Sequence, residues 1–281
     1  MVGELTWRKR VFGLWLPLAA FVVVALVPFT WMAVTSLKTN AELYDPKAMP
    51  LSIRHPSLIH YIDLLNETNF LIWVANTMLV AVIATGISLL LGSMLAYPLA
   101  RMRFRGAALL AITVAVTYLI PQTLLFVPMA DLIGRLKLGN TLSAVMLTYP
   151  TLLVPFIAFL LTGYFKTVPK ELEEQAMIDG ASRWRAMTRI ILPLCMPGFL
   201  SAGIFAFTLS QNEFLYALLF LSKSGVRTVS IGVVGELIRG DAFYWGQLMA
   251  GALLGSIPVA LIYSFFVKYY VAGLTAGAVK G

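Results

Sequence analysis

The sequence predicts an all-α integral membrane protein with six transmembrane helices. Of its 281 residues, 59% are hydrophobic and only 12% are charged, which is too apolar for a soluble domain. Six apolar runs approach the length of about 20 residues that a helix needs to cross a bilayer. With the N-terminus in the cytoplasm, the cytoplasmic segments hold most of the basic residues, as the positive-inside rule requires. Topology thus explains the net charge of +8, and no nucleic-acid partner is expected.

The first apolar run, residues 11–34, follows the basic cluster Arg8-Lys9-Arg10. It is longer than the apolar region of about 7–15 residues in a signal peptide, so we interpret it as an uncleaved first span. A polar outer segment, residues 38–69, then carries His55 and His60, with Pro56 between them. This spacing does not suit one helix face, so solvated loop histidines are expected and a metal site is not.

Five further runs form a core between residues 71 and 270. They are 71–97, 107–129, 142–164, 198–221 and 248–270. Prolines are expected to break three of these spans: Pro121 and Pro128 the third, Pro150 and Pro155 the fourth, and Pro258 the sixth. Such breaks survive in a bilayer where neighbouring helices or water satisfy the freed backbone groups. We therefore expect these spans to line a shared interior or a subunit seam.

The fifth span contains the polar cluster Gln211-Asn212-Glu213. At about 1.5 Å per residue, Glu213 lies roughly 22 Å along the helix from Gly198, in the outer third of the bilayer. A buried acid at this depth normally faces a cavity or a partner group. Two roles remain open for the cluster: a polar step in a substrate path, to which Gln122 beside Pro121 is a further candidate, or the pairing of the fifth helix with a neighbour.

The long polar passage in residues 166–193 predicts two short cytoplasmic helices joined by a bend. Pro169 suits the start of the first helix, and an acidic first turn favours the positive end of the helix dipole. That turn contains Glu171, Glu173 and Glu174. Gly180 can take the positive φ that ends the helix, and Ser182 can cap the second one. The second helix is expected to stop at Pro193.

The spacing within this passage follows the pattern E-x-A-x3-G-x9-I-x-L-P, beginning at Glu174. It resembles the coupling loop of the membrane subunits of ATP-binding-cassette (ABC) importers, with one departure, Gln175, where the family usually has alanine. The resemblance implies the MetI-like permease fold and an ATPase-coupling site. The residues implied are Glu171, Glu174, Ala176, Asp179, Gly180 and Ala181.

The C-terminal residues 271–281 carry a second motif, G-L-T-x-G-x-V-K-G. It is similar to the tail of carbohydrate-importer permeases related to the smaller membrane subunit of the maltose system. In that family the tail reaches into the interface of the ATPase dimer and lies in the cytoplasm. The positions implied here are Gly273, Leu274, Thr275, Gly277 and Lys280.

Together these resemblances imply one permease domain over residues 1–281, in a bacterial inner membrane, with both termini cytoplasmic. The implied partners are a second, non-identical permease subunit, a dimeric ATP-binding subunit and an extracytoplasmic solute-binding protein. The sequence contains no Gly-Lys dipeptide and so no phosphate-binding loop, which places ATP and Mg²⁺ on a partner chain, with no cofactor on this one. The expected function is the ATP-driven import of a sugar or oligosaccharide without chemistry of its own.

Two alternatives remain open at this point. One is a secondary transporter driven by an ion gradient, which predicts repeated halves and charged residues near the bilayer midplane. The other is an ABC importer for a non-sugar solute such as a polyol or glycerol phosphate.

Overall fold

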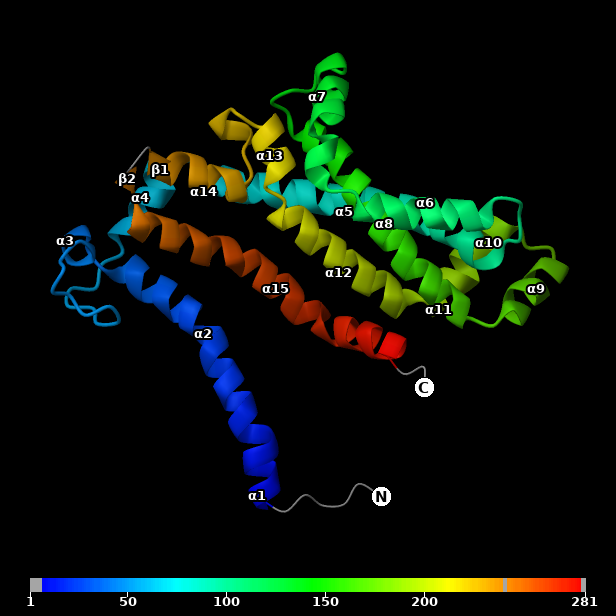
Figure 1. Cartoon of the computed structure of the whole chain (residues 1–281), viewed down its shortest axis with the longest axis horizontal. Coiled ribbons are helices and arrows are strands. Elements are labelled where there is room, and N and C mark those ends of the chain that lie inside the picture. The colour runs from blue at the N-terminus through cyan, green and yellow to red at the C-terminus, as the bar shows by residue number, and fades with distance from the viewer. Residues whose placement is uncertain (1–6, 240–241, 279–281) are drawn as a thin grey trace. The chain divides into compact units, whose positions relative to one another are not determined.

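The computed structural model describes residues 7–239 and 242–278, and there the all-α fold class is confirmed (Figure 1). The only strands in the described chain form a short antiparallel hairpin, with Ile238 opposite Phe243. The chain divides into two compact units. The first comprises Met1–Phe70 and Val233–Ile257, and the second comprises Leu71–Gly232 and Pro258–Gly281.

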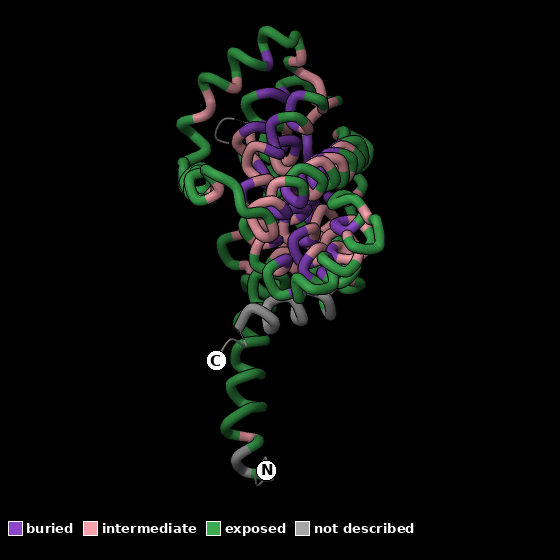
Figure 2. Tube along the Cα trace, turned by 90° about the vertical axis from the view of Figure 1, so that its right-hand side faces the viewer, coloured by how far each residue is buried: buried purple, intermediate pink, exposed green. Residues whose placement is uncertain are grey.

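The first unit begins with a long apolar helix. Its elements are α1 (Trp7–Arg10), a π-helical turn (Val11–Trp15), α2 (Leu16–Leu37), α3 (Asn40–Leu43), α4 (Ile59–Glu67), β1 (Ile238–Arg239), β2 (Ala242–Phe243) and the start of α15 (Trp245–Ala278). The side chains of α2 are largely exposed, as Figure 2 shows for the helix that leads away from the N-terminus. Such an apolar surface suits contact with lipid or with another chain.

The polar segment after α2 is folded. The Lys38 ammonium is 4% exposed and donates to the carbonyls of Met49 and Pro50, both at 2.9 Å. The buried Glu42 carboxylate accepts the backbone N–H of Arg54 at 2.9 Å. These bonds close the segment because a buried charge is stable only when its hydrogen bonds are satisfied.

The expectation of two solvated histidines is wrong for one of them. His55 is exposed, but His60 lies in α4 and is 2% exposed. His60 and Leu64 are four residues apart on the buried face of α4, and a Cβ at Gly246 would lie 2.1 Å from His60 Nε2. Among the described residues, no group of three His, Cys, Asp or Glu side chains is placed to hold a metal ion.

The second unit is organised around α8. Its helices and helical turns, in chain order, are α5 (Phe70–Arg101), α6 (Ala107–Leu119), the 3-10 turn η2 (Gln122–Leu125), α7 (Phe126–Arg135), α8 (Leu142–Thr167), α9 (Lys170–Ile178), α10 (Arg183–Ala186), the π-turn η3 (Met187–Ile191), α11 (Leu192–Leu194), α12 (Met196–Asn212), α13 (Leu215–Phe220), the 3-10 turn η4 (Ser224–Val226) and the end of α15. The boundary between the units falls within α14 (Val229–Leu237), after Gly232. The side chains of Leu153, Ile157, Leu161 and Phe165 give α8 a fully buried stripe, and it packs against α6, α12 and α13.

Four continuous helical stretches of the described chain are long and apolar enough to cross a membrane. They are Val11–Leu37, Phe70–Arg101, Leu142–Thr167 and Trp245–Val267. Two bent pairs raise the number to six if each pair is one span: Ala107–Leu119 with Gln122–Arg135, bent by 98°, and Arg183–Leu194 with Met196–Asn212, bent by 82°. The first bend lies at Pro121, as expected.

Four of the predicted proline effects are wrong. Pro150 and Pro155 lie inside the uninterrupted helix α8, and Pro258 lies inside α15. Pro193 lies within α11, and the chain bends two residues later, at Cys195. A proline removes one backbone hydrogen bond and kinks a helix, but packing can hold the helix together, and both prolines of α8 are buried.

Candidate functional site

The passage that resembles a coupling loop folds as two helices joined by a sharp bend. Helix α9 follows Pro169, and Gly180 ends it with φ +85°. The N–H of Ala181 donates to the carbonyl of Ala176 at 2.9 Å, and the N–H of Gly180 donates to that of Met177 at 3.1 Å, which satisfies the last carbonyls of the helix. Ser182 Oγ then accepts the N–H of Arg185 and caps α10. The predicted helices, bend and cap are therefore present.

The predicted coupling residues divide between an outer and an inner face of the loop. Glu171, Glu174, Asp179 and Gly180 are exposed, whereas Ala176 and Ala181 are half-buried. Two apolar side chains that the sequence analysis did not select are also exposed. They are Ile178, 84% exposed, and Trp184, 55% exposed. A loop with exposed acids and large apolar side chains has the composition of a protein-binding surface.

The remaining acid of this helix, Glu173, lies on the inner face, and the sequence did not predict that it is buried. It is 4% exposed, and its carboxylate accepts a hydrogen bond from the Tyr97 hydroxyl. Its Oε2 lies 3.6 Å from Arg101 Nε. Glu173 falls three and four residues before Ala176 and Met177 on α9, so helical spacing was the available signal.

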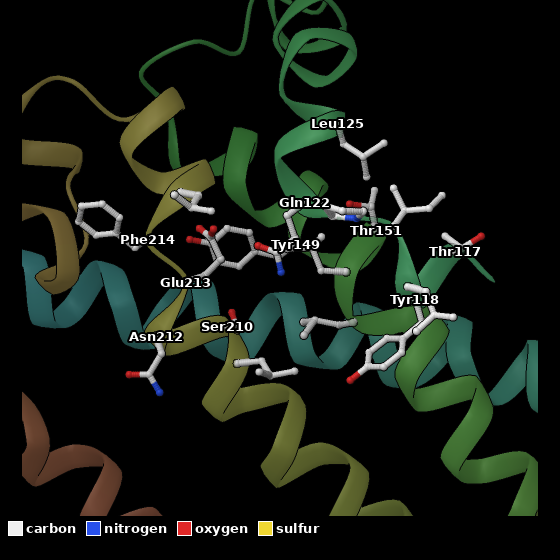
Figure 3. A pocket seen from close by; sticks show the side chains of 17 residues that line it. Thr117, Tyr118, Gln122, Leu125, Tyr149, Thr151, Ser210, Asn212, Glu213 and Phe214 are labelled. Atoms are coloured by element: carbon white, nitrogen blue, oxygen red, sulfur yellow. The ribbon is translucent and has the colours of Figure 1, made fainter. Parts of the chain in front are cut away.

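A cavity of about 680 Å³ lies beside α8 in the second unit, and Figure 3 shows its lining side chains. The lining residues come from α6, η2, α8, α12 and α13. The polar ones are Thr117, Tyr118, Gln122, Tyr149, Thr151, Ser210, Asn212 and Glu213. Gln122, Asn212 and Glu213 all line this cavity and Gln211 does not, while their role in a substrate path stays a prediction. No Lys or Arg is among its lining residues.

The Glu213 carboxylate binds backbone at the start of α13. It is 9% exposed, and its two oxygens accept the N–H groups of Tyr216 at 2.9 Å and Ala217 at 3.1 Å. The predicted fifth span is therefore interrupted at Glu213, between α12 and α13, because this side chain satisfies the free amides of a new helix. This cap lies within the span itself and is a third role, beside the substrate path and the pairing with a neighbouring helix that the sequence left open.

Two buried hydroxyl groups lie among the residues that line the cavity. Ser210 Oγ has no hydrogen-bond partner in the described structure, and the Tyr149 hydroxyl interacts with the Glu213 carboxylate. Figure 3 shows the Glu213 carboxylate beside the Tyr149 ring, while the Asn212 side chain points elsewhere. Asn212 Nδ2 donates to the carbonyl of Thr208 at 3.0 Å, one helical turn back.

The predicted C-terminal tail does not leave the last helix at residue 271. Gly273, Leu274, Thr275 and Gly277 lie within α15, which continues to Ala278. Lys280 lies outside the described residues.

Comparison with known proteins places these features in a family. Residues 88–275 match the family described as "Binding-protein-dependent transport system inner membrane component". The chain is 35% identical over 260 residues to the sulfoquinovosyl glycerol transport system permease protein SmoH of Agrobacterium fabrum, covering 92% of this chain and 90% of that protein. It is 35% identical over 262 residues to the trehalose/maltose transport system permease protein MalG of Thermococcus litoralis, covering 92% and 93%.

A solved structure agrees with the fold. A chain of a bacterial ABC transporter involved in the import of alginate matches with a TM-score of 0.79 at 20% identity, over 94% of this chain and 98% of that one. The family match, the two permease relatives and the shared fold lead to one conclusion: this chain belongs to the binding-protein-dependent transport system inner membrane component family.

Proposed function

We propose that this chain forms half of the translocation pore of an ATP-driven importer for a neutral sugar or oligosaccharide. The bend of the coupling loop carries the proposal, because a rigid loop with exposed acids and apolar side chains can take up the movement of a partner. Family membership makes the chain the membrane subunit of a binding-protein-dependent transporter. It also disfavours the secondary transporter. Binding and hydrolysis of ATP with Mg²⁺ belong, in this proposal, to a dimeric partner on the cytoplasmic side.

The same proposal includes two further partners. A second, non-identical permease subunit completes the pore, and an extracytoplasmic binding protein delivers the solute. The chain lies in a bacterial inner membrane with both termini in the cytoplasm, and its C-terminal segment reaches the ATPase interface. Closure of the ATPase dimer moves the coupling loops, and the pore alternates between two accesses.

The cavity supports a hydroxylated and uncharged solute. Ser210 contributes a hydroxyl group without a partner and Tyr149 a hydroxyl group beside Glu213, and such groups recognise a sugar through hydrogen bonds. Phosphate recognition uses cationic side chains or free helix N-termini. The lining residues include no Lys or Arg, and the free amides at the start of α13 already bind Glu213. A neutral sugar or polyol is therefore favoured over glycerol phosphate.

The proposal is tested by transport in proteoliposomes that contain this chain with its partner subunits. Uptake of labelled maltose, trehalose and glycerol phosphate is measured with and without ATP on the side of the membrane that carries the ATPase subunits. We expect ATP-dependent uptake of a neutral sugar, and loss of uptake in Glu174→Lys, which reverses a charge on the exposed face of α9. Uptake that follows an imposed ion gradient without ATP contradicts the proposal.

A further inference from the structure

A buried ionic cluster joins the coupling helix α9 to the end of α5. It consists of Tyr97 and Arg101 from α5 and Glu173 from α9. The exposed fractions are 6% for Tyr97 and 4% for Glu173, and the Arg101 side chain is 2% exposed. The Tyr97 hydroxyl donates to one carboxylate oxygen of Glu173, and Arg101 Nε lies 3.6 Å from the other.

Arg101 makes a second attachment in the same place. Its Nη2 donates to the carbonyl of Val168 at 2.8 Å, in the short connection between α8 and α9. The coupling helix is therefore held through its own side chain and through the backbone just before it. Separating the buried carboxylate from the buried guanidinium is unfavourable, because each would lose part of its compensation for desolvation.

Helix α5 is in turn closely packed on the helix that lines the cavity. A Cβ added at Gly92 of α5 would lie 2.5 Å from Ile157 Cγ2 of α8, so the Ile157 side chain packs directly against the backbone of α5, where only glycine leaves room for it. Tyr149 and Thr151 of the same α8 line the cavity. Contacts thus run without interruption from α9 through α5 and α8 to the cavity.

We propose that Glu173 is a positioning residue that fastens the coupling helix to α5, so that movement imposed on α9 reaches the cavity. This inference rests on the proposed function. It divides the acids of α9 between two tasks: Glu171 and Glu174 face outward to the ATPase partner, and Glu173 faces inward to this chain. A loop held only by its two ends would bend and lose the movement.

The test measures solute uptake per ATP hydrolysed in the assembled complex, together with the amount of ATPase subunit that co-purifies. Glu173→Gln keeps the size of the side chain and an acceptor for Tyr97 but removes the ion pair with Arg101. We expect the ATPase subunits to remain bound and uptake per ATP to fall by roughly fivefold or more, the usual range of a coupling between sites. Lys166→Gln, which removes an exposed charge at the end of α8, is the control and retains the wild-type ratio.

Two further variants separate coupling from folding. Tyr97→Phe removes a single hydroxyl and is expected to assemble normally with a smaller loss of uptake per ATP. Combining Glu173→Gln with Arg101→Gln is expected to lower the ratio no further than Arg101→Gln alone, because Arg101→Gln already removes both the ion pair and the bond to Val168.

The outcomes distinguish this inference from the proposed function. Wild-type uptake per ATP in Glu173→Gln and Tyr97→Phe overturns the inference and leaves the proposed function intact. Loss of the bound ATPase subunits in Glu173→Gln also overturns it, since the residue would then act in docking. Normal transport in Glu174→Lys counts against the coupling loop itself, whatever Glu173 does.

Discussion

Replacing Gly180 by valine is expected to abolish most ATP-driven uptake while the protein still inserts in the membrane. Gly180 has φ +85° at the bend between α9 and α10, in the left-handed region that a β-branched residue adopts at a high cost. A Cβ at this position would meet no atom within 4 Å. The penalty is therefore one of backbone conformation, without a steric clash.

The size of the effect follows from that conformational cost. Placing an L-residue in the left-handed region costs roughly 1–2 kcal/mol. The loop can avoid this cost only by changing conformation and losing the hydrogen bonds from Gly180 and Ala181 to the end of α9. A change of this size alters the ratio of two conformations by about 5–30-fold. We expect uptake to fall in a similar proportion, with Gly180→Asn much milder because asparagine tolerates this region.

The assay compares uptake and bound ATPase subunits for the three proteins at equal amounts in the membrane. Gly163→Val is the matched control, because Gly163 lies within α8, is exposed and also has no atom within 4 Å of an added Cβ. Equal transport by Gly180→Val, Gly163→Val and the wild type would refute the reasoning that the bend must be held in this conformation.

Three more outcomes are expected. Glu213→Gln keeps one of the two acceptors at the start of α13 and is expected to lower the free energy of unfolding by about 1–3 kcal/mol; Glu213→Ala loses more, and unchanged denaturation midpoints in detergent for both would contradict the cap. Removal of residues 275–281 is expected to reduce solute-stimulated ATP hydrolysis in the complex, whereas equal rates would leave the tail without a role there. Burial lowers the pKa of His60 below its ordinary 6.5, so the folded segment disfavours protonation and loses stability as the pH falls below about 6.5. Hydrogen exchange in α4 is expected to become faster as the pH is lowered, and His60→Gln is expected to remove this pH dependence. The same dependence in His60→Gln would contradict the assignment to His60.

The coupling loop could be predicted in detail because its signals are local. Pro169, Gly180 and Ser182 each act on backbone within a few residues; Gly180 and Ser182 take the predicted places, and Pro169 stands one residue before the helix that it was expected to begin. The burial of Glu173 depends instead on Tyr97, which lies 76 residues away in the sequence. The length and charge of the loop gave no indication of that contact.

The proline predictions failed for a related reason. The sequence shows where a backbone bond is missing, but the surroundings decide whether the helix continues. Pro150 and Pro155 are buried in the packed helix α8 and do not interrupt it, whereas the chain turns by 98° at Pro121, which lines a cavity. The sequence correctly marked Glu213 as a polar residue within the fifth span. Its role as a helix cap could not be predicted, because the sequence did not show that the span is interrupted there.

Two of the spans expected from the sequence, residues 107–129 and 198–221, are interrupted beside the same cavity. Ile120, Pro121 and Gln122 from the first break and Glu213 and Phe214 from the second all line the same cavity. Irregular backbone is tolerated at membrane depth only where protein or water satisfies it, and both of these breaks lie at the cavity. Broken helices often present a positive N-terminus to an anionic solute. Here the Glu213 carboxylate already accepts the free amides at the start of α13, so that helix end is not open to an anionic solute.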